Sequence, residues 1–302
     1  MDGIVNIFKP AGMTSMNVIS RVRRILGEKK VGHIGTLDPD VTGVLPVFIG
    51  KATRAIHYVQ DGGKSYSAEM LLGVTTDTQD ATGIVLSSSV CEAEDAEIVA
   101  ALKSFKGEYV QNPPMYSAKK VGGQKLCDLA RKGIEVERKP HPVEIYSIKN
   151  ITVTREAQTL EIRMKFDVDC SRGTYIRTLC HDVGIKLGCG AHMSWLQRTA
   201  SCGFKLEDTV TLEELETAAE SGELNNIMQD IESLFEDLPA IIYDSNLRVD
   251  LLNGKKLKAS HIMHEGLYSI LDDEGQFVAL ARVYFEISSG VLKVKLERQF
   301  VI

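Results

Sequence analysis

The sequence predicts an α+β fold with a small β-rich module at its C-terminal end. Helical and strand patterns are mixed along the chain without a regular βαβ alternation, which disfavours a doubly wound parallel sheet. The 302 residues are enough for one large domain and a small one. The last 60-odd residues hold short alternating stretches separated by Gly and Asp turns.

Three segments have the apolar spacing of helices. "SMNVISRVRRILG" (15–27) follows a Ser/Thr cap and ends on glycine, and residues 94–105 carry acids in the first turn. "SRGTYIRTLCHDVGIKLG" (171–188) predicts a turn and then a helix with Arg177 in its first turn. A side chain there commonly reaches into a site, because the segment directly follows a strand.

Two segments alternate as strands: "KSYSAEMLLGV" (64–74) and "TLEIRMKFDVDC" (159–170), with the polar loop "TDTQDATG" after the first. Three shorter strands are expected near the C-terminus, in "GLYSILDD", "FVALARVYF" and "VLKVKLERQF". Pro239 marks a boundary, so we predict a large domain over 1–237 and a small module over 238–302.

A long Pro/Gly-containing segment, about 112–140, contains one short helical stretch near Leu126 to Ala130. Loops of this length are usually functional or disordered. We expect a mobile, mostly basic insertion.

The net charge of −6 is unevenly distributed. Residues 205–240, predicted to be mainly helical, carry eleven acids and one base, whereas residues 103–140 carry nine bases and four acids. Basic regions therefore remain available for phosphates, although ordinary solvated surface charge explains the same pattern.

Composition narrows the class of protein. No apolar run approaches a membrane span, and the N-terminus has no signal-peptide pattern, so we expect a cytoplasmic protein without a membrane partner. The six cysteines form no CxxC pair and indicate reduced thiols. Cys180, His181, Cys189 and His192 suggest zinc only weakly, because adjacent helical residues point about 100° apart. We expect no metal site.

The stretch "GHIGTLDPDVTGVLPVFIGKATR" (32–54) places Asp38 before a proline inside a Gly- and Thr-rich turn. Pro39 fixes its own φ and pushes Asp38 towards extended geometry. An isolated Asp-Pro is most often a plain turn. A carboxylate held this way is also compatible with a phosphoryl acceptor or a covalent nucleophile.

"DPDVT" (38–42) matches the DxDx[TV] pattern of aspartyl phosphotransferases. That chemistry also needs Mg²⁺, a nearby lysine and a strongly hydrophobic strand before the turn. Here "GHIGTL" precedes the turn, and the later acidic pair, Asp272 and Asp273, falls in the C-terminal module. The phosphotransferase is therefore the weaker hypothesis.

The whole set of motifs resembles the TruB family of tRNA pseudouridine synthases. They are "KPxGxTS", "GHIGTLDPxxTGVLPVFIGKATR", "KSY", "TDTQDATG", "QNPPMYSAKK", "RGTYIR" and "LQRTASCGF", in order over about residues 3 to 235. The resemblance implies a mixed, largely antiparallel sheet flanked by helices, and a PUA-like RNA-binding module at the C-terminus. It implies an isomerase that converts uridine 55 of the tRNA T loop to pseudouridine, without cofactor or metal.

The resemblance also implies roles for individual residues. Asp38 matches the catalytic nucleophile, and Arg177 would pair with it. Tyr66 would stack on the uracil, and His33 would help to keep the nucleotide flipped out. The remaining implied substrate-binding residues are Asp80, Tyr175 and Leu196. Lys9 and Lys64 are looser candidates for phosphate or structural contacts.

Each of these residues also has an ordinary structural interpretation. By periodicity alone Tyr66 is a core tyrosine, Asp80 a turn residue, His33 a loop donor and Arg177 a surface arginine. Ile34 and Gln197 depart from the family pattern at peripheral positions. A non-catalytic tRNA-binding or tRNA-folding module is the competing class. We expect a monomer that binds the tRNA T stem-loop without an obligate protein partner.

Overall fold

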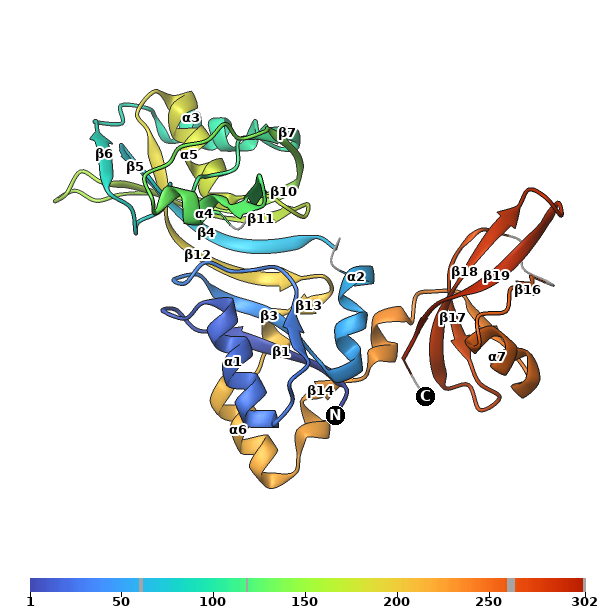
Figure 1. Cartoon of the computed structure of the whole chain (residues 1–302). Helices are drawn as coiled ribbons and strands as arrows, with labels where there is room; N and C mark the ends of the chain where they lie inside the picture. Colours follow the sequence, from blue (N-terminus) through green and yellow to red (C-terminus); the bar gives the residue numbers. More distant parts are fainter. Residues whose placement is uncertain (60–61, 118, 260–263, 301–302) are drawn as a thin grey trace.

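The computed structural model describes residues 1–59, 62–117, 119–259 and 264–300. It confirms the predicted α+β class: a large mixed sheet with helices packed against it, followed by a smaller sheet (Figure 1). The ten strands of the large sheet are β1 (Gly3–Lys9), β2 (Val31–His33), β3 (Thr42–Ile49), β4 (Lys64–Leu72), β7 (Gly107–Gln111), β10 (His141–Arg155), β11 (Ile162–Cys170), β12 (Ala191–Ser201), β13 (Phe204–Lys205) and β14 (Met228–Gln229).

The large sheet consists of two halves that meet at one short contact. Its main path runs β14-β1-β3-β12-β4-β11-β10-β7. The pairings along this path are antiparallel except between β3 and β12, which pair in parallel only at Gln197↔Thr42 and Arg198↔Gly43. Beyond this contact β3 and β12 diverge, as Figure 1 shows. The divergence opens the space in which the site lies.

Gly43 makes that close contact possible. A Cβ at this position would lie 2.2 Å from the carbonyl oxygen of Arg198, and Gly43 has a φ of +105°. Any other residue would clash with the β12 backbone and strain its own.

Helices cover the two halves separately. The α-helices are α1 (Ser15–Leu26), α2 (Ile56–Val59), α3 (Asp95–Lys103), α4 (Leu126–Ala130), α5 (Ile176–Leu187), α6 (Leu212–Ser221) and α7 (Ser245–Leu252). Short 3₁₀ helices are η1 (Gly50–Arg54), η2 (Leu206–Asp208), η3 (Leu224–Asn226) and η4 (Ile231–Phe235). Within the described ranges, no helix combines the length and apolar character that a membrane crossing requires.

Each half has its own hydrophobic core. One core packs α3 and α5 on β4, β11 and β12, and includes Met70, Phe166 and Leu179. The other packs α1 and α6 on β1 and β3. The capping boxes at Thr14 and Thr211 start α1 and α6, and left-handed glycines end both helices. Leu37 and Val41, from the segment between β2 and β3, also belong to the first core, so this segment packs against the other half of the sheet.

The predicted helices over 15–27, 94–105 and 171–188 correspond to α1, α3 and α5, and the strands over 64–74 and 159–170 to β4 and β11. The sequence did not reveal β10, the longest strand. Register shifts between Ile145 and Ser147 and between Lys149 and Thr152 break its apolar alternation. The polar loop "TDTQDATG" proves to be the turn of a hairpin between β5 (Val74–Thr76) and β6 (Val85–Ser88).

The acidic stretch is less α-helical than predicted. Only α6 is an α-helix, and the rest is short 3₁₀ helices, the strand β14 and turns. Thr211 and Glu214 do form the capping box that their spacing indicates. Glycine at 222 then ends the helix after ten residues.

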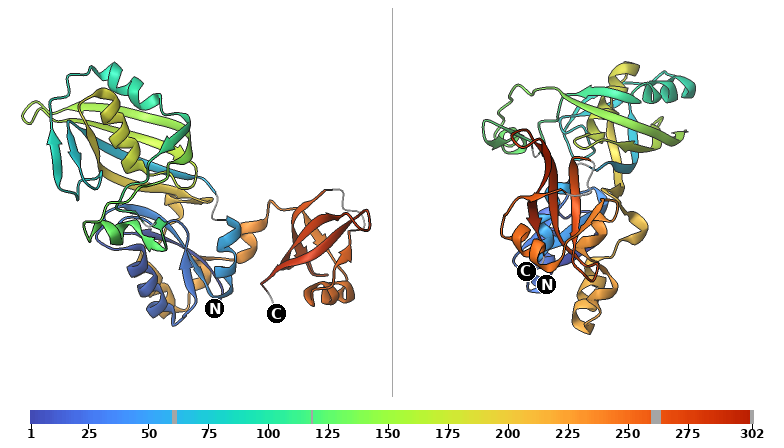
Figure 2. Two further views of the ribbon diagram at one scale, coloured as in Figure 1. Left: turned by 45° about the horizontal axis from the view of Figure 1, so that its top comes forward. Right: turned by 90° about the vertical axis from the view of Figure 1, so that its right-hand side faces the viewer.

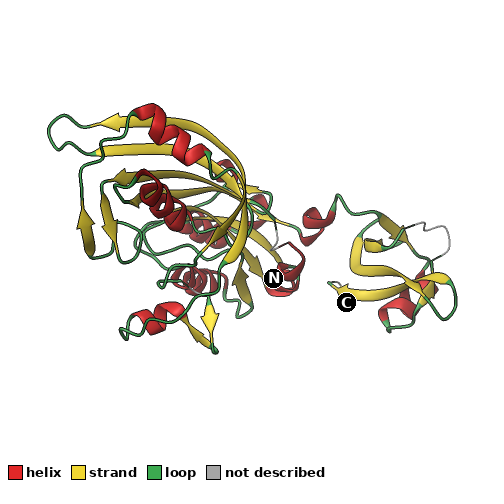
Figure 3. Cartoon of the chain, turned by 90° about the horizontal axis from the view of Figure 1, so that it is seen from above, coloured by secondary structure: helices red, strands yellow, loops and turns green. Residues whose placement is uncertain are grey.

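The C-terminal strands form a separate five-stranded sheet in the order β15-β17-β18-β19-β16. Its strands are β15 (Ala240–Ile242), β16 (Leu257–Lys258), β17 (Gly266–Leu271), β18 (Phe277–Glu286) and β19 (Val291–Gln299). Figures 2 and 3 show this C-terminal module beside the main body, with α7 against it. Phe235 joins the two parts, because its ring stacks on Phe277 with centroids 5.5 Å apart.

The segment 112–140 carries little regular structure, as its composition indicates. A two-stranded ribbon, β8 (Lys120–Val121) and β9 (Gln124–Lys125), leads into α4. Leu126 and Leu129 are buried, whereas most of the other described side chains of the segment are exposed or half-buried. The segment is therefore attached at α4 and at its N-terminal end, where Pro113, Pro114 and Ser117 are also buried.

Candidate active site

The Asp38 turn is fixed by two residues from the first strand and helix. Lys9 is fully buried, and its ammonium donates to the carbonyl of Pro39 at 2.7 Å. The Ser15 hydroxyl accepts a hydrogen bond from the Leu37 amide at 2.9 Å. The carboxyl of Asp38 is thus presented from a backbone held on both sides.

Burial lowers the pKa of Lys9 to about 8, against the opposing charges of Asp40 and Asp38. Its bonds to carbonyl oxygens and its burial make it a structural support of the turn. This agrees with the structural alternative suggested for Lys9 by the sequence.

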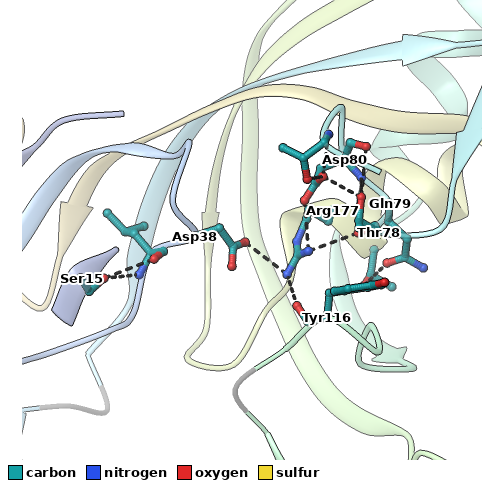
Figure 4. A network of polar contacts seen from close by, with 10 residues as sticks. Ser15, Asp38, Thr78, Gln79, Asp80, Tyr116 and Arg177 are labelled. Atoms are coloured by element: carbon teal, nitrogen blue, oxygen red, sulfur yellow. Dashed lines mark hydrogen bonds and ion pairs between the residues drawn. The ribbon is translucent and has the colours of Figure 1, made fainter. Parts of the chain in front are cut away.

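Arg177 connects Asp38 to a second carboxylate across the site. Its guanidinium lies 3.2 Å from Asp38 Oδ2 and 3.1 Å from Asp80 Oδ2. It also donates to the carbonyls of Thr78, at 3.2 Å, and Tyr116, at 2.8 Å. Figure 4 shows the Asp38 and Arg177 side chains pointing toward one another from opposite walls. Arg177 is only 6% exposed, so it is not an ordinary surface arginine.

Asp80 is anchored by its own loop. The side chain accepts hydrogen bonds from the hydroxyls of Thr78, at 2.7 Å, and Thr82, at 2.6 Å. Burial alone would raise the pKa of Asp80, but these hydrogen bonds and the charge of Arg177 outweigh it and lower the pKa. Asp80 is therefore an ionised partner that orients Arg177.

Opposing influences act on the Asp38 carboxyl. Its side chain is 44% exposed at the cavity wall, yet desolvation by the surrounding protein is the largest influence and raises its pKa. The charges of Arg177 and Lys9 lower the pKa, and those of Asp80 and Asp40 raise it. The net shift of the Asp38 pKa is upward, and the charge of Arg177 is the strongest influence that favours the ionised carboxylate.

Two adjoining cavities share Asp38, Arg177 and Leu196 in their walls. We call the smaller, about 260 Å³, the Tyr66 lobe and the larger, about 560 Å³, the Trp195 lobe, after a residue that lines each. The candidate carboxylate thus lies where the two lobes meet.

The Tyr66 lobe brings together several residues that the sequence identified. Tyr66, Tyr175 and Leu196 line it beside Asp38. Tyr66 is largely buried, and burial raises the pKa of its hydroxyl to about 12, so it remains neutral. Tyr66 packs in the core, as its periodicity predicts, and it also lines the cavity.

Arg198 is a buried cation behind the same lobe that the sequence analysis did not select. It donates to the carbonyls of Val44, at 2.7 Å, and Gly35, at 2.9 Å. Burial lowers the pKa of its guanidinium, and the interaction with Tyr66, which includes a side-chain hydrogen bond, opposes that shift. Lys64 and Arg172 also line this lobe, which makes it suited to an anionic group.

His33 lies apart from the lining of both lobes. It ends β2, opposite Val47 of β3, and it is half-buried. Burial and the nearby Arg198 lower the pKa of His33, which favours the neutral ring. The structure does not bring His33 to the wall of either cavity.

The residue-by-residue analysis missed three contacts of the candidate site, made by Ser15, Thr78 and the carbonyl of Tyr116. All three fall inside quoted motifs, "KPxGxTS", "TDTQDATG" and "QNPPMYSAKK". Membership of these motifs was therefore the sequence signal that could have identified the three residues. Backbone acceptors such as Tyr116 cannot be identified from side-chain chemistry.

The alternative metal and phosphotransferase sites do not assemble in the described parts of the chain. Over these ranges, no three His, Cys, Asp or Glu side chains are grouped as metal ligands would be. Asp272 and Asp273 lie in the turn between β17 and β18 of the C-terminal module, in the other sheet. The Asp38 turn precedes the hydrophobic strand β3 rather than following one.

The sequence matches two family profiles and many relatives. Residues 23–176 match "TruB family pseudouridylate synthase (N terminal domain)" and residues 177–236 match "tRNA pseudouridylate synthase B C-terminal domain". A Clostridium acetobutylicum protein named tRNA pseudouridine synthase B is 43% identical over 94% of this chain and 96% of its own. An Alkaliphilus oremlandii protein of the same name is 46% identical over 87% of this chain and 85% of its own.

Solved structures share the fold. The chain aligns with a TM-score of 0.71 and 28% identity to a protein in "Structure of H/ACA RNP bound to a substrate RNA containing 2'-deoxyuridine", over 99% of this chain and 85% of that one. It aligns to a chain of a "Cbf5-Nop10-Gar1 Complex" with a TM-score of 0.71 and 29% identity, over 99% of this chain and 85% of that one. The fold and the sequence matches are those of a pseudouridine-forming isomerase. The chain belongs to the TruB family of pseudouridylate synthases.

Proposed function

We propose that this chain converts uridine 55 in the T loop of tRNA to pseudouridine, with Asp38 as the nucleophile. The ion pair between Asp38 and Arg177, placed where the two lobes meet, is the observation that carries this proposal. The names of the relatives support tRNA as the substrate.

The reaction exchanges one glycosidic bond for another. The bond between uracil N1 and ribose C1′ breaks, the bond between C5 and C1′ forms, and the proton on C5 is replaced by one on N1. Asp38 would add to the base or to the sugar and hold the intermediate while the base turns. Both additions need an ionised carboxylate, which the Arg177 charge favours.

The target base must leave its loop to reach Asp38, at a cost of a few kcal/mol. Stacking on an aromatic ring is worth about 1–3 kcal/mol, so a Tyr66 contact would offset much of that cost. Tyr175 and Leu196 would close the remaining sides of the lobe. Lys64 and Arg198 lie where the charge of a nucleotide phosphate would be favoured.

His33 would act outside this lobe, by contact with the RNA loop, in keeping the flipped nucleotide out. We infer that the protein acts as a monomer without a bound cofactor or metal. Action as a monomer would distinguish this chain from the Cbf5 structure whose title names Nop10 and Gar1 as further components of the complex. The C-terminal module, 238–302, would be the PUA-like RNA-binding domain.

Position-resolved pseudouridine mapping tests this function. The pure full-length chain is incubated with a T stem-loop RNA in the presence of excess EDTA. One pseudouridine at the T-loop position is expected. RNA that binds but remains unmodified would favour the non-catalytic tRNA-folding role. A strict requirement for protein-bound Mg²⁺ on pre-folded RNA would instead revive the phosphotransferase.

A further inference from the structure

Trp195 is the single tryptophan of the chain, and it is 41% exposed on the wall of the Trp195 lobe. Isolated exposed apolar side chains are common, so its exposure alone indicates nothing. Its place is informative. The next residue, Leu196, lines both lobes, so the indole lies one residue from the wall of the proposed uracil pocket.

The backbone of β12 is shaped to put Trp195 there. The pairing of β12 with β4 shifts register between Met193 and Trp195, so Ser194 is an extra residue, and its hydroxyl donates to Glu69 at 2.8 Å. A regular strand would point neighbouring side chains to opposite faces. At this bulge, Trp195 and Leu196 both line the cavity.

The edge of β12 beside Trp195 is open. In the described structure, β3 pairs with β12 only from Gln197 onward. Trp195 precedes this pairing, and residues from both halves of the sheet line the cavity beside it. The indole is therefore accessible to a ligand that extends out of the Tyr66 lobe past Asp38.

The charges around the two lobes differ. The Tyr66 lobe is lined by cations, among them Lys64, Arg172 and Arg198. The Trp195 lobe contains the carboxylates of Asp40 and Asp128 and the thioethers of Met16 and Met193. Its own arginine, Arg131, is paired with Asp128 at 3.5 Å. Phosphate is disfavoured beside these carboxylates, whereas a neutral planar group fits an aromatic and thioether surface.

We propose that Trp195 stacks on an unpaired nucleobase of the bound RNA loop, next to the base that enters the Tyr66 lobe. This inference rests on the proposed function, since it requires an RNA loop at Asp38. Every nucleobase has a π-face, so the contact adds affinity with little base preference. Trp195 is then a positioning residue, which holds the loop while the target base is turned.

Binding of a T stem-loop RNA by the full chain tests this role, in an Asp38→Asn background that prevents turnover. Because Trp195 is the only tryptophan, its fluorescence should change on binding and report the contact directly. Trp195→Ala should weaken binding by about 5- to 100-fold, and Trp195→Phe by much less. Leu160→Ala, which removes an exposed apolar side chain between β10 and β11 that lines neither lobe, should bind as the parent does.

Abasic substitution at each unpaired loop position other than the target separates stacking from a structural effect. One abasic position should weaken binding to the parent and have no further effect on Trp195→Ala. If Trp195→Ala and Trp195→Phe bind as tightly as the parent, the inference is wrong. A loss that is the same for every abasic RNA, or a lowered unfolding temperature in both variants, would also overturn it. Pseudouridine formation by the wild-type chain distinguishes this failure from failure of the proposed function.

Discussion

At the scale of single residues, the site depends on the balance of charge around one carboxyl group. Burial raises the pKa of Asp38, and the Arg177 guanidinium is the strongest opposing influence. Arg177 is in turn held by Asp80 and two backbone carbonyls. The ionised state of Asp38 therefore depends on groups contributed by three separate segments of the chain.

Replacing Arg177 tests this balance. Arg177→Met removes the charge that lowers the pKa of Asp38, so the pKa should rise further. Because the reaction needs the carboxylate, the single-turnover rate should fall by orders of magnitude near neutral pH and recover partly as pH rises. Arg177→Lys keeps the charge but loses the planar fork, and should be intermediate. A Met variant whose pH–rate profile runs parallel to wild type would show that Arg177 only orients Asp38.

Asp80→Asn should shift the pH dependence in the opposite direction. The charge of Asp80 raises the pKa of Asp38, so its removal should let Asp38 ionise at lower pH. The acid limb of the single-turnover profile should move to lower pH, even though looser positioning of Arg177 lowers the maximal rate. Shifts in the same direction for Asp80→Asn and Arg177→Met would contradict the electrostatic account.

Sequence reasoning could reach the pairing of Arg177 with Asp38, because both residues lie in distinctive motifs. It could not predict the hydrogen bond from Arg177 to the carbonyl of Tyr116, because a backbone acceptor does not depend on the type of side chain. Arg198 and Trp195 were also missed. Their roles depend on where β12 leaves β3, which is a property of the whole sheet.

At the scale of elements, strands with clean alternation were predictable and irregular or fully buried ones were not. In β4 and β11, buried side chains alternate regularly with more exposed ones, so both strands could be predicted from the sequence. The register shifts of β10 hide its pattern. β3 is almost entirely buried and contains Pro46, so it shows neither alternation nor the usual composition of a central strand.

Segment 112–140 forms a wall of the Trp195 lobe through residues such as Tyr116 and Cys127. Its attachment through α4 and its exposed basic residues lead us to expect that it closes on RNA. Hydrogen exchange across 119–140 should be fast in the free chain and slow in the complex. Helix α3, which lines neither lobe, serves as the control, with equal protection in both states. Equal protection of 119–140 in both states would show that it is an ordinary packed segment.

At the scale of the whole molecule, the C-terminal module is joined to the main body by a small aromatic cluster. Phe235 stacks on Phe277 and lies 5.9 Å, centroid to centroid, from Phe300, while Tyr58 meets it edge-on. The sequence predicted a boundary at Pro239 from composition. It gave no indication of this cluster, because the four aromatic residues come from four separate segments of the chain.

Phe235→Ala should loosen this attachment without affecting the cleft. Removing a buried phenylalanine costs about 3–5 kcal/mol in a packed interior. Limited proteolysis in the linker around 236–244 should become faster, while modification of a short T stem-loop stays near the wild-type rate. Phe285→Ala, which removes an exposed ring, is the control. Unchanged cleavage by the protease would mean that other contacts hold the module.

The central claim is that the carboxylate of Asp38 is the nucleophile of pseudouridine formation, and Asp38→Asn tests it most directly. The amide is nearly isosteric, so the turn held by Lys9 and Ser15 should persist and RNA binding should stay within a few-fold of wild type. Single-turnover assays with position-resolved mapping on the T stem-loop should detect no pseudouridine. Turnover by the purified Asp38→Asn chain above about a hundredth of the wild-type rate, far more than loss of a covalent nucleophile allows, would place the nucleophile elsewhere.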